Sequence, residues 1–322
     1  MNKIKTFRYH IATMVFSVFL CFTACKEKES HKQKTKVPEQ EPKNTMYQSS
    51  VFTPPNGFPS GIEGPAVDAN GTLYAVNFER PGTIGKVDAQ GNAQLFVELP
   101  DGSVGNGIRF NGQGDMLIAD YTKHNILKVD MDTHEITVFA HNAQMNQPND
   151  IAIMDNDILF ASDPDWENSK GQIWRIDTNG TFTLLETDMG TTNGIEVSPD
   201  NKTLYVNESV QRNIWAYDLT SQGEISNKRL FHTFKDFGMD GMRCDDQGNL
   251  YVTRYGKGTI VKISPKGDVL QEIQLTGKRA SNIAFGGSKG TTAFVTLQDN
   301  GNVETFTVES PGRSFHMMNT NR

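Results

Sequence analysis

Cysteine is scarce in this 322-residue chain: only three occur, and Cys244 is the only one beyond residue 25. A single cysteine can neither close a disulfide within the folded part of the chain nor build a structural zinc site, so both are excluded there. We expect Cys244, which lies in an apolar segment, to be a small buried side chain. The seven histidines include no pair spaced i and i+4, so the histidine pair of helical zinc sites is missing too.

Basic stripes and long apolar runs are also absent. The formal net charge is −7, and an acidic balance repels the phosphates of nucleic acids, so we expect no nucleic-acid partner. The apolar segment 11–24 is 14 residues long, shorter than the roughly 20 residues that a membrane-spanning helix needs. The sequence therefore predicts no transmembrane helix.

The N-terminus has the pattern of a secretory signal peptide, because residues 1–10 are basic and residues 11–24 are apolar. It ends in Phe22-Thr23-Ala24-Cys25, which resembles a bacterial lipobox, where the cysteine is lipidated and becomes the new N-terminus. Lys26 follows, and no Asp is present there to favour the inner membrane. We expect a lipoprotein of the bacterial cell envelope, at the outer membrane and facing the periplasm or the surface, with the membrane reached only through the lipid anchor. An ordinary secretory signal with an incidental cysteine is the alternative.

Six short phrases recur along the chain, and each begins with a side chain that carries oxygen. Their first residues, 43, 43, 44, 47 and 41 positions apart, are Glu63, Asn106, Asn149, Asn193, Asp240 and Ser281. A period of about 40–45 residues with several strands per repeat is typical of the blades of a β-propeller.

Alternating polar and apolar residues, interrupted by Gly, Asn and Asp turns, predict four strands in each repeat. In the second repeat these are 107–111, 115–121, 125–130 and 135–140. The predicted fold is all-β: a six-bladed β-propeller with four antiparallel strands per blade. The sixth repeat lacks an obvious fourth strand, so we predict that the N-terminal segment 46–53 closes it, with 314–318 as the alternative.

The predicted domain organisation has four parts. A signal peptide (1–24) precedes a flexible tether (25–45), which is charged and too poor in apolar residues to form a core. The propeller spans 46–313 and a polar tail spans 314–322. We expect the protein to be a monomer.

Equivalent positions on the innermost strands of a propeller converge on one axis, so the six phrases would place two carboxylates, three amides and a hydroxyl around a channel. Glu63 and Asp240 would repel each other there unless a cation lay between them. Carboxylate and amide oxygens without histidine or cysteine favour Ca²⁺ or Mg²⁺ over zinc or copper. The alternative for each position is that it caps a strand entry, as Asn and Asp do in turns.

Two further features could carry function. Residues 286–290 (GGSKG) match the GxSxG motif of hydrolases, but they fall in a predicted hairpin turn rather than a strand-to-helix turn, so we interpret them as a turn. Trp166 follows the second strand of the third repeat, where it is either part of a connecting loop or a wall of a substrate site.

The phrases resemble those of the senescence-marker-protein, gluconolactonase and luciferin-regenerating-enzyme family of six-bladed propellers. The resemblance covers roughly residues 50–310 and is strongest in the segments that begin at Ile62, Gln147, Thr192 and Met239. The family's metal site uses a Glu, two Asn and an Asp from four blades. These correspond to Glu63, Asn149, Asn193 and Asp240 of this sequence.

Members of this family hydrolyse lactones, and relatives hydrolyse organophosphates. The resemblance implies a gluconolactonase-like carboxylic ester hydrolase in which Ca²⁺, or Mg²⁺, Mn²⁺ or Zn²⁺ in its place, polarises the carbonyl of a lactone or ester and Asp240 orients or activates water. Asn106, Asn149 and Ser281 are the predicted substrate contacts. A non-catalytic propeller on a lipoprotein tether and a phosphotriesterase-like hydrolase are the alternative functions.

Overall fold

The protein is described by a computed structural model over residues 46–320. The predicted signal peptide (1–24), the lipidation site Cys25, the tether (25–45) and residues 321–322 lie outside this range. The described part contains 24 strands and one helix, α1 (Arg313–Thr320). That helix is neither long nor apolar enough to cross a membrane.

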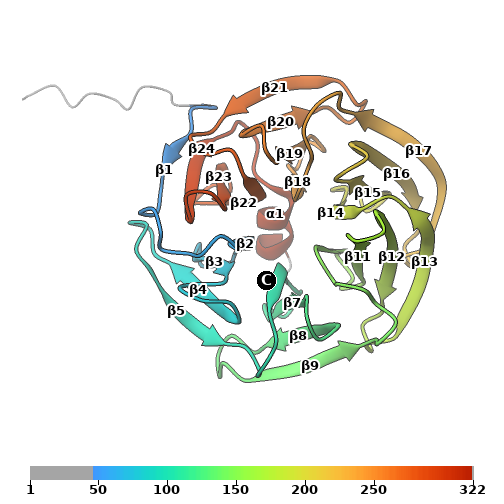
Figure 1. Cartoon of the computed structure of the whole chain (residues 1–322), viewed down its shortest axis with the longest axis horizontal. Coiled ribbons are helices and arrows are strands. Elements are labelled where there is room, and N and C mark those ends of the chain that lie inside the picture. The colour runs from blue at the N-terminus through green and yellow to red at the C-terminus, as the bar shows by residue number, and fades with distance from the viewer. Residues whose placement is uncertain (1–45, 321–322) are drawn as a thin grey trace, which may run out of the picture. The chain divides into compact units, whose positions relative to one another are not determined.

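The strands form six antiparallel sheets of four strands each, arranged as blades around a central axis (Figure 1). Blade one contains β2 (Glu63–Val67), β3 (Leu73–Val76), β4 (Thr83–Val87) and β5 (Ala93–Glu98). Blade two contains β6 (Gly105–Phe110), β7 (Met116–Asp120), β8 (Asn125–Val129) and β9 (Ile136–His141). Blade three contains β10 (Ile151–Ile153), β11 (Leu159–Asp165), β12 (Lys170–Ile176) and β13 (Phe182–Met189). Blade four contains β14 (Thr192–Val197), β15 (Thr203–Glu208), β16 (Asn213–Leu219) and β17 (Ile225–Thr233). Blade five contains β18 (Met242–Cys244), β19 (Leu250–Arg254), β20 (Thr259–Ile263) and β21 (Val269–Gln274). Blade six contains β22 (Ala280–Gly286), β23 (Thr292–Leu297), β24 (Asn302–Thr307) and β1 (Ser50–Val51).

The innermost strand of every blade contacts the innermost strands of both neighbouring blades, so the ring is closed. The core lies between adjacent sheets, where apolar side chains of consecutive blades pack together, as Tyr74 and Val76 of blade one do with Ile108 and Phe110 of blade two. In blades two, four and five, a side chain of the innermost strand points away from this core, and the three meet at the axis: Glu196 lies 3.4 Å from Arg109 and 3.8 Å from Arg243. The fold thereby confirms the predicted six-bladed propeller.

Turns between the first two strands of a blade are set by local side-chain hydrogen bonds. In blades one, two and five, Asp68, Asn111 and Asp245 each accept backbone N–H groups two and four residues later through Oδ1. The fourth residue of each turn is a glycine with positive φ, such as Gly71 at 87°. These turns fix the register that brings the first residue of each inner strand to the opposite end of the channel.

The N-terminal strand closes the ring as predicted. In blade six, β1 pairs with β24 through Ser50 opposite Thr305 and Val51 opposite Glu304. Segment 314–318, the alternative for closure, belongs to α1 and forms no strand. Residues near both ends of the propeller meet at the buried ammonium of Lys262, which contacts the Tyr47 hydroxyl (3.1 Å), Glu309 and Asp245 (3.8 Å).

Replacing Lys262 with Met is expected to lower the free energy of unfolding by about 2–3 kcal/mol, measured by urea denaturation. The change leaves the buried Asp245 and the half-exposed Glu309 without their shared cation, and unpaired buried charges are costly. Lys266→Met is the control, since Lys266 is exposed in the following turn and should change stability by less than about 0.5 kcal/mol. Equal effects of the two substitutions would contradict a role for Lys262 in closing the ring.

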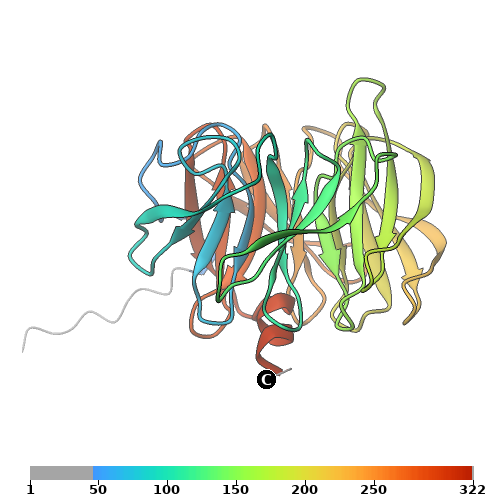
Figure 2. The same ribbon diagram turned by 90° about the horizontal axis from the view of Figure 1, so that it is seen from below.

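Helix α1 was not predicted: the sequence indicated a polar tail over 314–322. The helix lies at the centre of one face of the ring (Figures 1 and 2). Arg313 fixes it by donating to the Ile153 carbonyl and to Asp155, both at 2.8 Å, and the Met317 side chain is buried. The helix covers one end of the channel, so only the other end can serve as an entrance.

Candidate active site

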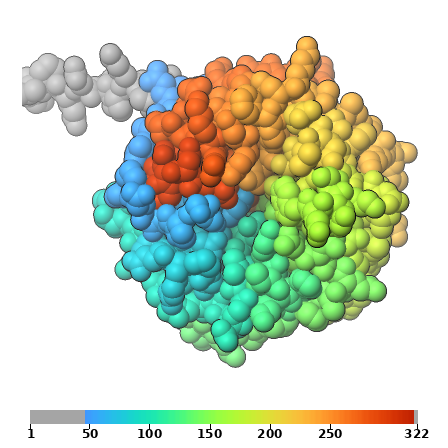
Figure 3. Space-filling model, in the orientation of Figure 1, coloured from blue at the N-terminus to red at the C-terminus, as the bar shows by residue number. Residues whose placement is uncertain are grey.

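Five of the six predicted ring positions line one cavity of about 310 Å³ at the end of the channel opposite α1. We call these five residues the inner ring: Glu63, Asn106, Asn149, Asn193 and Asp240. Each stands within two residues of the start of its innermost strand, and those strands run from here towards α1. Figure 3 looks onto this face, which is hollowed at its centre.

Ser281 is the exception, and the prediction that it contacts substrate is corrected. Its side chain is fully buried; the hydroxyl donates to the Ile62 carbonyl at 2.8 Å and lies 2.8 Å from the Thr296 hydroxyl. In blade six the register shifts between Ala280 and Asn282, and Asn282 takes the axial place. Asn282 Nδ2 donates to Glu63 Oε2 at 2.9 Å. In blade six it is therefore Asn282, and not Ser281, that contacts the inner ring.

Two amide oxygens of the inner ring have no partner among the described residues. Asn149 and Asn193 are buried, and the Oδ1 atom of each lacks a hydrogen bond. A buried carbonyl oxygen without a partner costs free energy, and native proteins rarely leave one unsatisfied. Asn106 is fixed nearby, since its Nδ2 donates to the Asn149 backbone carbonyl at 3.0 Å.

The two carboxylates of the inner ring disfavour ionisation in each other's presence. Burial, together with the charge of Asp150, raises the pKa of Glu63 to about 7. Burial and the charge of Glu63 raise the pKa of Asp240 well above its usual range. A hard cation bound here would offset the repulsion between the two buried carboxylates and would accept the two unpartnered carbonyl oxygens as ligands. This donor set therefore fits a divalent metal. Within residues 46–320, no cluster of three or more His, Cys, Asp or Glu side chains offers a competing metal site.

Asp240 is held in place through its own backbone. Its carbonyl accepts hydrogen bonds from Asn207 Nδ2 at 2.6 Å and from the Gly194 amide at 3.2 Å. Ser209 donates to the carbonyl of the preceding residue, Met239. The carboxylate therefore sits on a segment with a fixed backbone, which a catalytic or metal-ligating side chain requires.

A buried ionic cluster lies beneath the inner ring. Arg243 pairs with Asp150 at 2.8 Å, and Arg109 pairs with Asp150 and with Glu196 at 3.4 Å each. Burial raises the pKa of Asp150, but Arg243 and Arg109 outweigh it, so that the pKa lies below its usual range. Glycine is needed beside this cluster: a Cβ at Gly107 would lie 2.7 Å from Asp150 Oδ1. These charges are not apparent from the sequence, because each arginine stands inside an otherwise apolar phrase.

A second set of side chains lines the cavity above the inner ring. Each is the first residue after the second strand of its blade, from blade two to blade six, and we call the set the outer ring: Tyr121, Trp166, Ser209, Tyr255 and Gln298. Of these five residues, only Trp166 was a candidate from the sequence, as a substrate wall or a loop residue, and its side chain lines the cavity. The sequence feature that could have identified the other four is their shared position directly after the second strand of each blade.

Similarity to a known protein family identifies the family of this chain. Residues 36–299 match the family described as the SMP-30/Gluconolactonase/LRE-like region. The chain belongs to this family.

Its relatives include enzymes named for lactone hydrolysis. Gluconolactonase of Zymomonas mobilis is 30% identical over 220 residues, which are 61% of this chain and 61% of that protein. Diisopropyl-fluorophosphatase of Loligo vulgaris is 25% identical over 285 residues, or 79% of this chain and 90% of that protein. The chain matches less than two thirds of the length of several of these relatives: 61% of the Zymomonas gluconolactonase and 46% of pentonolactonase XacC of Haloferax volcanii. Among solved structures, the calcium-binding protein regucalcin from Agrobacterium tumefaciens superposes with a TM-score of 0.70 at 22% identity, covering 82% of this chain and 97% of its own, which supports the same fold.

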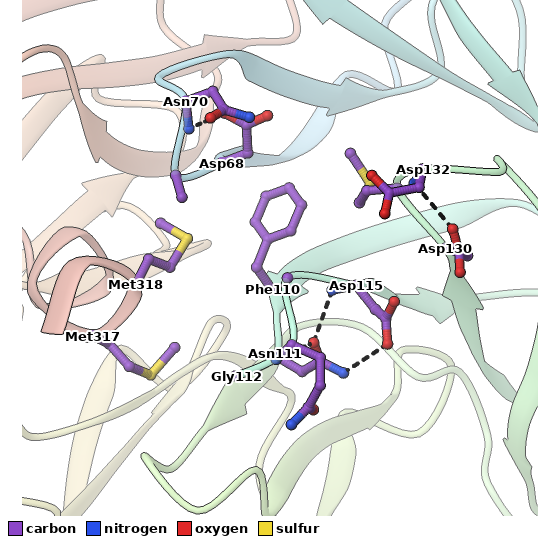
Figure 4. Close-up of a pocket in the computed structure, with 14 residues that line it drawn as sticks. Asp68, Asn70, Phe110, Asn111, Gly112, Asp115, Asp130, Asp132, Met317 and Met318 are labelled. Carbon is purple, nitrogen blue, oxygen red and sulfur yellow. Dashed lines mark hydrogen bonds between the residues drawn. The ribbon is translucent and has the colours of Figure 1, made fainter. Parts of the chain in front are cut away.

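This SMP-30/gluconolactonase family member has another cavity, of about 260 Å³, beside Met317 and Met318 on the α1 face (Figure 4). Two of its acidic side chains are engaged in their own turns: Asp68 accepts from the Asn70 amide at 2.9 Å and Asp130 from the Asp132 amide at 3.0 Å. No lining residue of this cavity is among the described residues with an unpartnered buried polar atom. The convergent chemistry therefore lies at the open end of the channel.

Proposed function

We propose that this chain is a gluconolactonase-like lactonase that opens a cyclic ester by attack of water. One observation carries the proposal: Glu63, Asp240 and the unpartnered amide oxygens of Asn149 and Asn193 line the same cavity. The lactonases among its relatives support the reaction class. The N-terminal sequence pattern supports a location in the bacterial cell envelope.

The four donors that would hold a divalent cation are Glu63, Asn149, Asn193 and Asp240. Oxygen ligands of this kind suit Ca²⁺, and relatives named for calcium support the choice. When bound, the cation polarises the ester carbonyl and stabilises the negative charge that develops on its oxygen.

Asp240 is the proposed general base. Its carboxylate lines the cavity beside the other proposed ligands, where it can accept a proton from water. The water oxygen bonds to the acyl carbon, the ring C–O bond breaks, and the proton passes from Asp240 to the departing ring oxygen. The product is one open-chain hydroxy acid, so atoms and charge balance. Asn106 remains a proposed substrate contact.

Hydrolysis of glucono-1,5-lactone and other lactones by the purified chain tests the proposal, with acid release followed in a pH-stat. We expect turnover that EDTA abolishes and added Ca²⁺ restores. A chain that binds Ca²⁺ but hydrolyses no lactone would contradict the proposal and favour the non-catalytic propeller.

A phosphotriesterase-like hydrolase is the second candidate, favoured by the similarity to diisopropyl-fluorophosphatase over 79% of this chain. The same purified protein can be assayed with diisopropyl fluorophosphate. Faster turnover of that substrate than of every lactone would favour this alternative.

A further inference from the structure

The outer ring contains no charged side chain. Its members are two tyrosines, a tryptophan, a serine and a glutamine, and no Lys, Arg or His is among the ten described residues that line the cavity. Among these ten residues, the only charged groups are the inner-ring carboxylates Glu63 and Asp240. The arginines beneath the ring, Arg109 and Arg243, are paired with Asp150 and Glu196 and do not line it.

Four of the five outer-ring side chains form two groups that face each other across the entrance. Tyr121 and Trp166 belong to the adjacent blades two and three, and Tyr255 and Gln298 to blades five and six on the opposite side of the ring. The Tyr255 hydroxyl donates to Gln298 Oε1 at 3.0 Å. The loop that carries Trp166, between β11 and β12, rises above this face (Figure 2).

Both tyrosine hydroxyls stay neutral and close to the catalytic end of the cavity. Burial raises the pKa of Tyr121 and of Tyr255, and the charge of Asp240 raises both further. Asp240 therefore lies within electrostatic reach of hydroxyls on opposite sides of the entrance. A substrate that reaches Asp240 must pass between the two groups of the outer ring.

We propose that the outer ring determines substrate specificity and selects lactones that carry no charge. This inference rests on the proposed lactonase function. Aromatic faces pack against the C–H groups of a flat ring, and the neutral hydroxyl and amide groups pair with its polar substituents. An anionic substituent among the outer-ring side chains would lose water without gaining a cationic side chain as a partner, because no Lys, Arg or His lines the cavity.

Arg279 is a cationic group near the outer ring. Its positive charge lowers the pKa of Tyr255 and so opposes the rise that burial causes. Its side chain is exposed and does not line the cavity. An exposed guanidinium is screened by water and salt, so it compensates little for burying an anion deeper in the site.

The test compares glucono-1,5-lactone with its 6-phosphate, which share the reacting ring and differ in one charged group. We expect kcat/KM for the phosphorylated lactone to be lower by at least about 100-fold. Similar values, or a preference for the phosphate, would overturn the inference and leave the lactonase function intact.

A binding measurement decides the inference even if no lactone is turned over. Glucono-1,5-lactam and its 6-phosphate are added to the protein, and quenching of Trp166 fluorescence is followed, with Trp166→Phe as the reference for the other tryptophans. The neutral lactam should bind at least about tenfold more tightly than the phosphate. Equal affinities would overturn the inference.

A variant that gains activity on the phosphorylated lactone is the sharper test. Gln298→Arg puts a guanidinium in the outer ring and should shift the ratio of kcat/KM values, phosphate over neutral lactone, upwards by at least about tenfold. Gln113→Arg is the matched control, because it adds the same charge at an exposed site on the α1 face. A ratio that stays unchanged in Gln298→Arg, or that rises equally in the control, would contradict the role of the outer ring.

Discussion

Replacement of Asp240 by asparagine is expected to lower kcat for lactone hydrolysis by about 10³-fold, within the range that a general base contributes. Asparagine keeps the shape of the side chain but cannot accept the proton from water. The backbone bonds that hold this segment, from Asn207 Nδ2 and the Gly194 amide to the residue 240 carbonyl, do not depend on the carboxylate. The measurements are kcat, bound Ca²⁺ and the melting temperature.

The melting temperature separates a chemical from a structural loss. Removal of one of two buried like charges should make the metal-free protein at least as stable as the parent at pH 8, because Glu63 then ionises without a charged neighbour at position 240. Asp132→Asn, an exposed carboxylate at the α1 face, is the control and should retain full activity. If Asp240→Asn keeps more than a tenth of the parent kcat, Asp240 is not the base. If the variant fails to bind Ca²⁺ at saturating concentration, Asp240 acts as a ligand.

The fold could be predicted because one signal repeats six times. The spacing of the six phrases fixes the blade number, and the strand-like segment 46–53 accounts for the missing fourth strand of blade six. A propeller converts such a repeat into a convergence of side chains on the axis. The positions of all four proposed ligands therefore follow from the repeat, and the family resemblance distinguishes them from Asn106 and Ser281.

Ser281 shows where that reasoning fails. The sixth phrase begins with two polar residues, Ser281 and Asn282, and a repeat pattern does not distinguish which faces the axis. The register shift after Ala280 decides it, and side chains alternate, so a shift of one residue exchanges the two faces. Such a shift is a property of pairing between strands and leaves no mark on residue spacing.

Helix α1 could not be predicted for a different reason. An isolated helix of eight residues is marginal in water, so its stability comes from tertiary contacts rather than from local preference. Arg313 supplies these contacts through Ile153 and Asp155, more than 150 positions earlier in the chain. The outer ring was hidden as well, since its residues share a position in the blade but not a residue type.

Calcium is expected to raise the melting temperature by several degrees at pH 8 and by much less at pH 5. Glu63 has a usual pKa of 4.5 and a pKa of about 7 in the folded protein, so folding favours its protonated form. In the metal-free protein, stability is then lost as the pH rises from 4.5 to 7, by an amount on the order of 3 kcal/mol. A cation between Glu63 and Asp240 offsets this loss, and a ligand at 100 times its Kd adds about 2.7 kcal/mol. At pH 5 the cation must displace a proton from Glu63, which weakens its binding.

Glu63→Gln provides the matched control, because glutamine keeps the size of the side chain and cannot ionise. Its metal-free form should show a smaller decrease in stability between pH 4.5 and 7, because only the buried Asp240 still titrates there, and calcium should no longer raise its melting temperature. Calorimetric scans at pH 5 and pH 8, with EDTA or with CaCl₂, measure both effects in the two proteins. A calcium shift of equal size at both pH values, or one that survives in Glu63→Gln, would place the cation elsewhere. The two buried carboxylates would then need another explanation for their proximity.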